Sequence, residues 1–120
     1  MSVRYVNYKQ RPKYTSDLTA FYAGTEKPLP PGYISGPIIR DCYILEYVHT
    51  GKGKVEINSN AFDVETGQAF VTFPGAVTTM TTDEKEPWGK SWVCLQGERV
   101  RYFLNLLGIK EPDSFIALST

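Results

Sequence analysis

The sequence is poor in the residues from which metal sites and redox centres are usually built. Its 120 residues include two cysteines and one histidine. Two cysteines are too few for a disulfide framework, and their spacing fits no zinc motif. We therefore expect Cys42 and Cys94 to be buried, reduced thiols that pack as small apolar side chains. A single histidine cannot build a metal site, and we expect His49 at the surface or at a sheet edge.

The chain also lacks net charge and long apolar runs. Its 13 basic and 13 acidic residues cancel, which leaves no electrostatic footprint for nucleic acid or for an anionic membrane. No apolar run approaches the ~18 residues that a membrane span needs. The N-terminus has no signal-peptide core, so we expect a cytoplasmic protein. A length of 120 residues with 42% apolar residues is adequate for one domain with a real core.

Several familiar chemical motifs are absent. The sequence has no glycine-rich dinucleotide or Walker-type loop, no nucleophile elbow of the form G-x-S-x-G, and no cysteine paired with a histidine. The Gly51–Gly53 stretch reads as a hairpin turn and not as a phosphate cradle, because no helix follows it. These absences argue against a nucleotide-binding enzyme or a hydrolase.

Short apolar or alternating segments dominate what is present. They predict strands, with turn residues between them, and a loop over the proline-rich stretch 24–36. Short strands at nearly regular spacing are typical of a β-sandwich or barrel. The strands are predicted over residues 18–23, 38–49, 54–58, 61–64, 68–73, 77–82 and 91–96.

One segment has helical periodicity instead. Over residues 98–107 the apolar side chains of Val100, Phe103, Leu104 and Leu107 recur at helical spacing, and Gly108 follows as a C-terminal cap. We expect this amphipathic helix to pack on the barrel, although an exposed helix that pairs with a partner is the alternative. The predicted organisation is an N-terminal arm or short edge strand (1–17), a barrel (18–97), and a helix and tail (98–120).

Two glycine-punctuated segments resemble the paired motifs of cupin barrels. The resemblance implies a mainly β fold, a double-stranded β-helix or jelly-roll barrel with one C-terminal helix, and a divalent metal held by three histidines and a glutamate. Counting from Gly51 and Gly67 places these four ligand positions on residues without suitable donor atoms. We therefore predict no metal and no cofactor. The replaced positions are Ile38, Arg40, Ile44 and Thr78.

Strand alternation predicts one wall of the barrel interior. If the motif positions point inward, then so do the residues of the same parity between 38 and 48. A guanidinium aimed inward needs an acceptor, and for Arg40 this is either Glu46 or a carboxylate or hydroxyl of a ligand. The inward set comprises Ile38, Arg40, Cys42, Ile44, Glu46 and Val48.

A second wall is predicted around two tryptophans. Trp88, Lys90, Trp92 and Cys94 share one parity. An indole beside cationic donors suits a sugar, because the ring covers the C–H face while the donors bind hydroxyls. Tryptophans that simply fill a core are the alternative.

The order of these features resembles the N-terminal effector-binding domain of AraC-type transcription regulators. The resemblance spans residues 20–108, and it is carried by segments 23–26, 36–53, 67–75, 87–88 and 92–93 and by the helix that ends at Gly108. It implies a barrel that binds a small effector, often a sugar, and that controls a DNA-binding domain outside this chain. The implied partners are therefore a sugar-like molecule, DNA for the full-length protein only, no membrane, and a possible homodimer.

The resemblance also assigns site residues by position. The pocket tryptophan of the arabinose regulator falls on Trp92, its pocket histidine on Lys90 and its pocket tyrosine on Met80. Its sugar-gripping arginine falls on a glycine, so Arg40 is a candidate replacement. Thr25 lies near a loop that contributes to the site, and Tyr14 is a candidate lid residue on the arm.

Together these arguments predict a ligand-binding set and a ligand class. The set comprises Tyr14, Thr25, Arg40, Glu46, Thr78, Met80, Trp88, Lys90 and Trp92. The two cations favour a sugar or a sugar acid, and no catalytic residue is expected. Two other hypotheses stay open: a metal-free cupin enzyme such as a sugar isomerase or epimerase, with Glu46 as base, and a ligand-free module whose barrel is filled by side chains.

Overall fold

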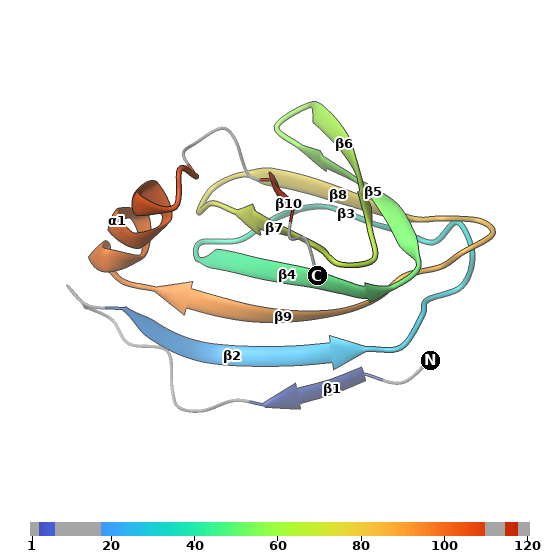
Figure 1. Ribbon diagram of the computed structural model, residues 1–120, viewed down its shortest axis with the longest axis horizontal. Coiled ribbons are helices and arrows are strands. Elements are labelled where there is room, and N and C mark those ends of the chain that lie inside the picture. The colour runs from blue at the N-terminus through green and yellow to red at the C-terminus, as the bar shows by residue number, and fades with distance from the viewer. Residues whose placement is uncertain (1–2, 7–17, 110–114, 118–120) are drawn as a thin grey trace.

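The computed structural model describes residues 3–6, 18–109 and 115–117, and the side chains of 18–109. The described parts form ten strands and one helix (Figure 1). The elements are β1 (Val3–Val6), β2 (Thr19–Glu26), β3 (Ile34–Ile39), β4 (Tyr43–Thr50), β5 (Lys52–Ile57), β6 (Asn60–Glu65), β7 (Gln68–Thr72), β8 (Val77–Thr82), β9 (Gly89–Gln96), α1 (Glu98–Leu106) and β10 (Phe115–Ala117).

The strands form two antiparallel sheets that face each other. One sheet has the order β1-β2-β9-β4-β7-β10, in which the central four strands are flanked by two short edge strands. The other has the order β3-β8-β5-β6. Since neighbours such as β2 and β9 are distant in sequence, the chain crosses between the sheets repeatedly. The predicted mainly β barrel with one C-terminal helix is confirmed.

The N-terminal part of the barrel differs from the prediction. Residues 38–49 are not one strand, because β3 and β4 lie in different sheets and residues 40–42 turn the corner between them. The amide of Gly75 donates to the carbonyl oxygen of Arg40 at 2.8 Å, which ties this corner to the β7–β8 turn. The predicted loop 24–36 is also shorter, since β2 runs to Glu26 and β3 begins at Ile34. The alternation of inward-facing side chains continues through the corner, so the sequence pattern does not reveal the break between β3 and β4.

The β4–β5 turn depends on glycine. Gly51 alone separates the two strands, and its φ of 71° is one that other residues rarely adopt. A Cβ at this position would collide with the carbonyl oxygen of Pro87. The tight turn therefore requires both the backbone freedom and the missing side chain of glycine.

One end of the barrel interior is filled by apolar side chains. The indole of Trp88 is buried there and packs on the backbone of Gly53, where an added Cβ would lie 2.5 Å from two ring carbons. This packed end anchors the two sheets to each other through apolar burial. Its buried members are Val48, Val55, Ile57, Val64, Phe70, Ala76 and Trp88.

The helix packs against the outside of the barrel, as expected. Val100 is buried, and Leu104 contacts a cluster formed by Val71, Phe73 and Ile109. Gly108 caps the helix with a φ of 82°, and the Ile109 amide donates to the Leu104 carbonyl, which is a Schellman motif.

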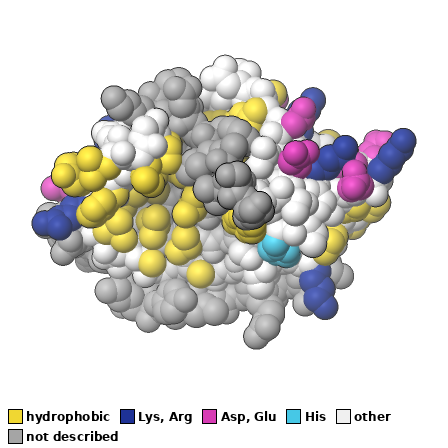
Figure 2. All heavy atoms as spheres, viewed as in Figure 1, with side chains coloured by type: hydrophobic (Ala, Val, Ile, Leu, Met, Phe, Trp, Pro, Cys, Tyr) yellow, Lys and Arg dark blue, Asp and Glu magenta, His cyan; other side chains and the backbone are white. Residues whose placement is uncertain are grey.

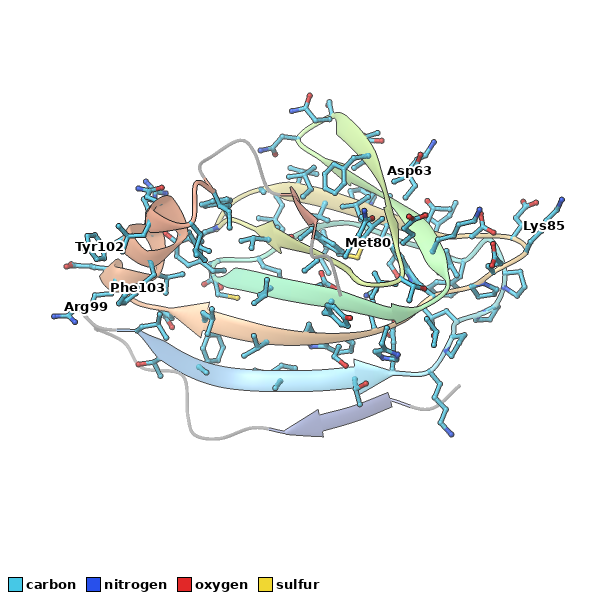
Figure 3. The ribbon with its side chains drawn as sticks, viewed as in Figure 1. Asp63, Met80, Lys85, Arg99, Tyr102 and Phe103 are labelled. Atoms are coloured by element: carbon cyan, nitrogen blue, oxygen red, sulfur yellow. The ribbon has the colours of Figure 1, made fainter. Side chains whose placement is uncertain are left out.

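The exposed side of the helix differs from the predicted stripe. The side chain of Phe103 is 44% exposed and that of Leu107 is 73% exposed, so only half of the predicted face is covered. Tyr102 and Phe103 lie together at this end of the molecule, where apolar side chains gather on the surface (Figures 2 and 3). No helix in the described part of the chain is long and apolar enough to cross a membrane.

Candidate ligand-binding cavity

A cavity of about 590 Å³ occupies the end of the barrel interior that the apolar core leaves open. This volume lies within the usual range for small-molecule sites. Figure 3 shows Met80 in the interior between the sheets, where its side chain contacts the packed end. The lining residues come from both sheets and from the β3–β4 corner: Phe21, Tyr22, Glu26, Ser35, Gly36, Ile38, Arg40, Asp41, Cys42, Ile44, Glu46, Thr72, Thr78, Met80, Lys90, Trp92 and Cys94.

The predicted inward alternation agrees with this lining. Ile38, Arg40, Cys42, Ile44 and Glu46 all line the cavity. The last member of the predicted set, Val48, continues the row into the packed end. The parity argument therefore holds across the corner, because the chain bends there without exchanging its inner and outer faces.

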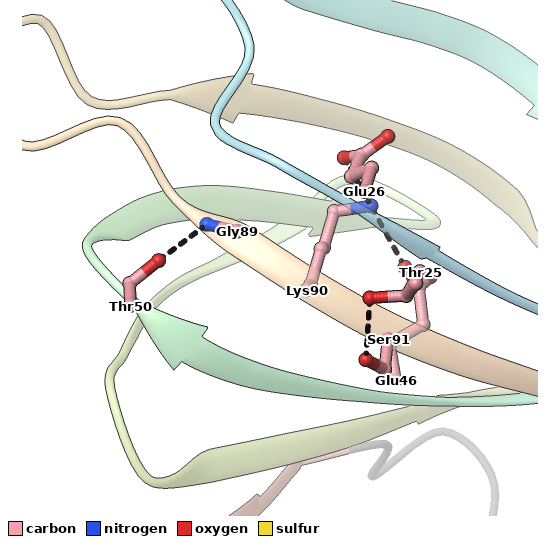
Figure 4. Close-up of polar contacts among 7 residues, drawn as sticks. All are labelled: Thr25, Glu26, Glu46, Thr50, Gly89, Lys90 and Ser91. Atoms are coloured by element: carbon pink, nitrogen blue, oxygen red, sulfur yellow. Dashed lines mark hydrogen bonds and ion pairs between the residues drawn. The ribbon is translucent and has the colours of Figure 1, made fainter. Parts of the chain in front are cut away.

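Lys90 occupies the centre of the polar wall. Its ammonium lies 2.9 Å from Glu46 Oε1 and 3.4 Å from Glu26 Oε1, with all three side chains at least nine-tenths buried (Figure 4). Burial alone would lower the pKa of Lys90, but the two carboxylates outweigh it and raise the pKa above its ordinary value. Lys90 is therefore a cation at neutral pH.

Two indoles flank the same ammonium. Lys90 Nζ lies 5.3 Å from the ring centroid of Trp92 and 5.5 Å from that of Trp88. Both distances fall within the range of cation–π attraction. Trp92 also lines the cavity, whereas Trp88 does not. The charged cluster and one aromatic ring therefore face the same space.

The surroundings of Arg40 bear on its two predicted acceptors. Glu46 accepts a hydrogen bond from Lys90, so its carboxylate is engaged away from Arg40. The side chain of Arg40 is exposed although it lines the cavity, which places it toward the mouth. The exposure of Arg40 and the bond from Lys90 to Glu46 favour a ligand group over Glu46 as the acceptor of Arg40, and this stays a prediction.

The two cysteines lie together in the cavity wall. Both are buried and unbridged, as expected, and the thiol of Cys94 contacts that of Cys42. This contact, together with burial, raises the pKa of Cys94 far above its ordinary value. Cys94 is therefore a neutral thiol at physiological pH, and it contributes an apolar surface.

Several buried polar atoms lack a hydrogen-bond partner. In the described part of the chain four buried side-chain atoms have none, namely Glu26 Oε1, Thr72 Oγ1, Thr78 Oγ1 and Trp88 Nε1. Glu26 Oε1 is within ion-pair distance of Lys90 but is not in a hydrogen bond. Three of these four residues line the cavity, and the fourth is Trp88 in the packed end. Since most buried polar groups in proteins are paired, this concentration marks the cavity wall as unusual.

The sequence-predicted residues divide into those that meet here and those that do not. Arg40, Glu46, Thr78, Met80, Lys90 and Trp92 line one cavity. Trp88 is a correction: although it shares their parity, it lies at the packed end and fills the apolar core. Tyr14 lies outside the described residues.

Thr25 is a second correction. It pairs with Ser91, whose hydroxyl donates to the hydroxyl of Thr25 at 3.0 Å, and neither residue lines the cavity. The neighbouring residue, Glu26, is the one that faces inward, because alternate residues of a strand point to opposite sides.

Several polar residues of the lining are not predicted by the sequence, and Glu26 and Thr72 are the two that matter most for the site. Glu26 falls in the predicted loop 24–36 because the predicted strand ends at residue 23, whereas β2 continues to Glu26. Thr72 lies at the end of a strand that was predicted, but a threonine in such a strand carries no sign of a ligand site. One signal in the sequence points to Glu26: if the strand is extended beyond residue 23, Tyr22, Gly24 and Glu26 face the same side of the sheet.

The interior does not suit a metal ion. The four positions that hold ligands in metal-binding barrels carry Ile38, Arg40, Ile44 and Thr78, of which none is a good donor for a divalent cation. Elsewhere in the described residues, no three His, Cys, Asp or Glu side chains come together as ligands would.

A second hollow lies at the surface between β5, β6 and residues 81–84. It measures about 640 Å³, and charged side chains on exposed strands dominate its rim. None of the four unpartnered buried atoms belongs to it. The interior cavity therefore has the stronger case as a binding site.

Comparison with known proteins assigns this fold and cavity to a family. A family model described as the AraC-like ligand binding domain matches residues 30–117. The chain belongs to this family. The AraC-like domain is 33% identical over 88 residues to the Msm operon regulatory protein of Streptococcus mutans. The matched region covers 73% of this chain and 31% of that regulator. The domain is 26% identical over 87 residues to the raffinose operon transcriptional regulatory protein RafR of Pediococcus pentosaceus, with coverage of 72% and 31%.

Solved structures confirm the cupin-type fold of this AraC-like domain. The protein YhaK from Escherichia coli superposes with a TM-score of 0.71 at 17% identity, covering 98% of this chain and 52% of YhaK. A Cupin 2 conserved barrel domain protein from Salinispora arenicola superposes with a TM-score of 0.59 at 15% identity. The superposition covers 87% of this chain and 84% of that protein. At such identities the likeness concerns the fold alone. The chain spans about a third of the length of the two regulators.

Proposed function

We propose that this AraC-like domain is the effector sensor of a transcription regulator and that its effector is a small sugar or sugar acid. The observation that carries the proposal is the position of Trp92 beside the buried Lys90 cluster in an open cavity. The names of the two regulators support the sugar class, since one is described as regulating a raffinose operon and both belong to operon regulation.

The cavity supplies both kinds of contact that a sugar needs. The indole of Trp92 offers an apolar surface for the C–H face of a pyranose ring. Lys90 and Glu46 supply a donor and an acceptor from the same wall, while Thr78 and Met80 line the opposite sheet. Arg40 at the mouth is available to a ligand group that extends outward.

The regulatory output is proposed to lie elsewhere in the polypeptide. Because the chain spans about a third of its relatives, DNA binding and dimerisation are assigned to the remainder of a longer regulator. Effector binding then has to favour one of two arrangements of the regulator, since a ligand shifts an equilibrium only by its differential affinity for the two states.

The geometry disfavours the enzyme hypothesis. Glu46, the only base considered for a sugar isomerase or epimerase, accepts a hydrogen bond from Lys90 at 2.9 Å. Its Oε1 is thus already engaged by the buried ammonium and is not free to take a proton from a substrate. The hypothesis of a filled, ligand-free barrel also fares worse, since Ile38, Ile44 and Trp92 border a cavity.

Calorimetry on the purified chain tests the proposal. A panel of neutral sugars and sugar acids is titrated into the wild type, Trp92→Phe and Trp92→Ala. A good aromatic contact is worth about 1 kcal/mol or more, so Trp92→Ala is expected to bind at least about fivefold more weakly. Trp92→Phe keeps an aromatic face, so its affinity is expected to lie between those of the wild type and Trp92→Ala.

Two results would contradict the proposal. Absence of binding by every sugar and sugar acid in the panel would remove the sugar class. Equal affinities of the wild type and Trp92→Ala, with both proteins folded by circular dichroism, would remove the stacking role of Trp92.

A further inference from the structure

We propose that the cavity selects an uncharged sugar over a sugar acid and that Thr72, Thr78 and Glu26 read its hydroxyl groups. This inference rests on the proposed sugar-binding function and narrows it to one ligand class. It replaces the argument from two cations, because the Lys90 ammonium is paired with two carboxylates, and Arg40 is exposed at the mouth rather than in the buried wall.

The first line of support is the charge of the buried wall. Lys90 was expected to offer a free cation, but its ammonium is held between Glu46 and Glu26. The buried cluster thus contains two carboxyl groups for one ammonium. Arg40 is solvated at the mouth, where Asp41 follows it in the lining. A ligand carboxylate entering this space would meet an excess of negative charge.

The second line of support is the unpartnered polar atoms. Thr72 and Thr78 line the cavity, and their Oγ1 atoms are buried and have no hydrogen-bond partner. Leaving such a group unpaired is costly, so a ligand that pairs with it gains affinity. Thr72 lies on β7 of one sheet and Thr78 on β8 of the other, which places hydroxyls on both walls.

Glu26 Oε1 completes the set as an acceptor. It lies 3.4 Å from Lys90 Nζ in an ion pair, and a carboxylate oxygen in such a pair can still accept a hydrogen bond from a ligand. A sugar hydroxyl can donate to this oxygen, whereas a ligand carboxylate has no proton to donate at neutral pH. Each threonine hydroxyl can donate or accept, and this matches the dual character of a sugar hydroxyl.

The experiment compares sugars that differ only in charge. Calorimetry measures the binding of galactose against galacturonate and of glucose against glucuronate, with raffinose as a larger neutral ligand. The wild type is expected to bind the neutral member of its preferred pair at least about tenfold more tightly than the acid, because like charges across a buried contact are strongly disfavoured. Glu26→Gln is expected to reduce this ratio.

Isosteric variants test the two threonines. Thr72→Val and Thr78→Val each remove one unpaired hydroxyl, so each is expected to weaken neutral-sugar binding by about two- to tenfold. The same variants are expected to leave the urea midpoint of the free protein unchanged or raised, because a buried group without a partner is lost. A purely structural role would lower the midpoint. Thr82→Val is the control, since Thr82 is buried on the same strand as Thr78 but does not line the cavity.

The outcomes separate the two proposals. If no sugar of either charge binds, the sugar-sensing function fails and this inference fails with it. If acids bind as tightly as their neutral partners, the selectivity is wrong while the sensing function stands. If Thr72→Val and Thr78→Val bind neutral sugars like the wild type, the hydroxyl-reading role is wrong.

Discussion

The ammonium of Lys90 and the carboxylate of Glu46 lie 2.9 Å apart in the buried wall of the cavity, although 44 residues separate them in sequence. They meet because β9 and β4 are neighbours, with Val48 opposite Lys90 and Glu46 opposite Trp92. The pair therefore lies diagonally across two strands and on the inner face of the sheet. This contact links the stability of the domain to the chemistry of its candidate site.

Replacement of Lys90 by methionine is expected to destabilise the domain. Lys90→Met leaves Glu46 and Glu26 buried without their cation, and removal of one partner from a buried pair costs about 3–5 kcal/mol. Urea denaturation followed by circular dichroism measures the change. Lys54→Met is the matched control, since Lys54 is exposed on β5 and should change stability little. A loss for Lys90→Met no larger than for the control would contradict a structural role of the pair.

The same pair predicts a dependence on alkaline pH. The folded-state pKa of Lys90 is raised above its ordinary value of 10.5, mainly because Glu46 and Glu26 outweigh the opposing effect of burial. A raised pKa means that the protonated form is favoured in the folded state. Its contribution to stability is therefore complete below pH 10.5 and is lost as the pH rises through the folded-state value.

The measurement is a difference between two proteins. Urea midpoints of the wild type and Lys90→Met are recorded from about pH 8 upward, and their separation is expected to stay constant at first and then to narrow as Lys90 titrates. A separation that widens as the pH rises through the alkaline range would have the wrong sign for this linkage.

Replacement of Gly53 by alanine is expected to disturb the packed end of the barrel. The new Cβ would lie 2.5 Å from two ring carbons of Trp88 and 2.7 Å from the Thr81 carbonyl oxygen. Such overpacking costs about 1–3 kcal/mol. The effect is measured by urea denaturation together with tryptophan fluorescence, since the Trp88 ring must move. Lys54→Ala, at the next and exposed position, is the control, and an equally small effect of both variants would show that the packing is looser than described.

Strand alternation predicted the inner wall well. Period-2 alternation identified five residues that line the cavity, Ile38, Arg40, Cys42, Ile44 and Glu46, before any strand was placed in a sheet. The reason is that a closed sheet has one inner face, so parity alone assigns each residue to the inside or the outside. The same argument failed for Trp88 because parity says nothing about position along the barrel axis.

The sequence did not show which charged side chains of the cavity are paired with one another. Arg40 and Lys90 were both recognised, yet whether a cation is free depends on what lies across from it. Glu26 reaches Lys90 from β2, a strand that lies next to β9 only because the sheet brings together segments that are far apart in the chain. No spacing rule connects residue 26 to residue 90, so the sequence does not reveal this partner of Lys90.

By itself the sequence determined the class of fold, the amphipathic helix with its glycine cap, and the loss of metal ligands from the barrel. These properties follow from local patterns and from residue chemistry, which need no knowledge of distant neighbours. Only the tertiary structure decided that the interior holds both a packed apolar cluster and a cavity, that the Lys90 ammonium is paired with carboxylates, and that the hydroxyls of Thr72 and Thr78 lack hydrogen-bond partners. Burial and pairing are properties of how separate strands meet, and in this chain the strands that meet are separated by many tens of residues.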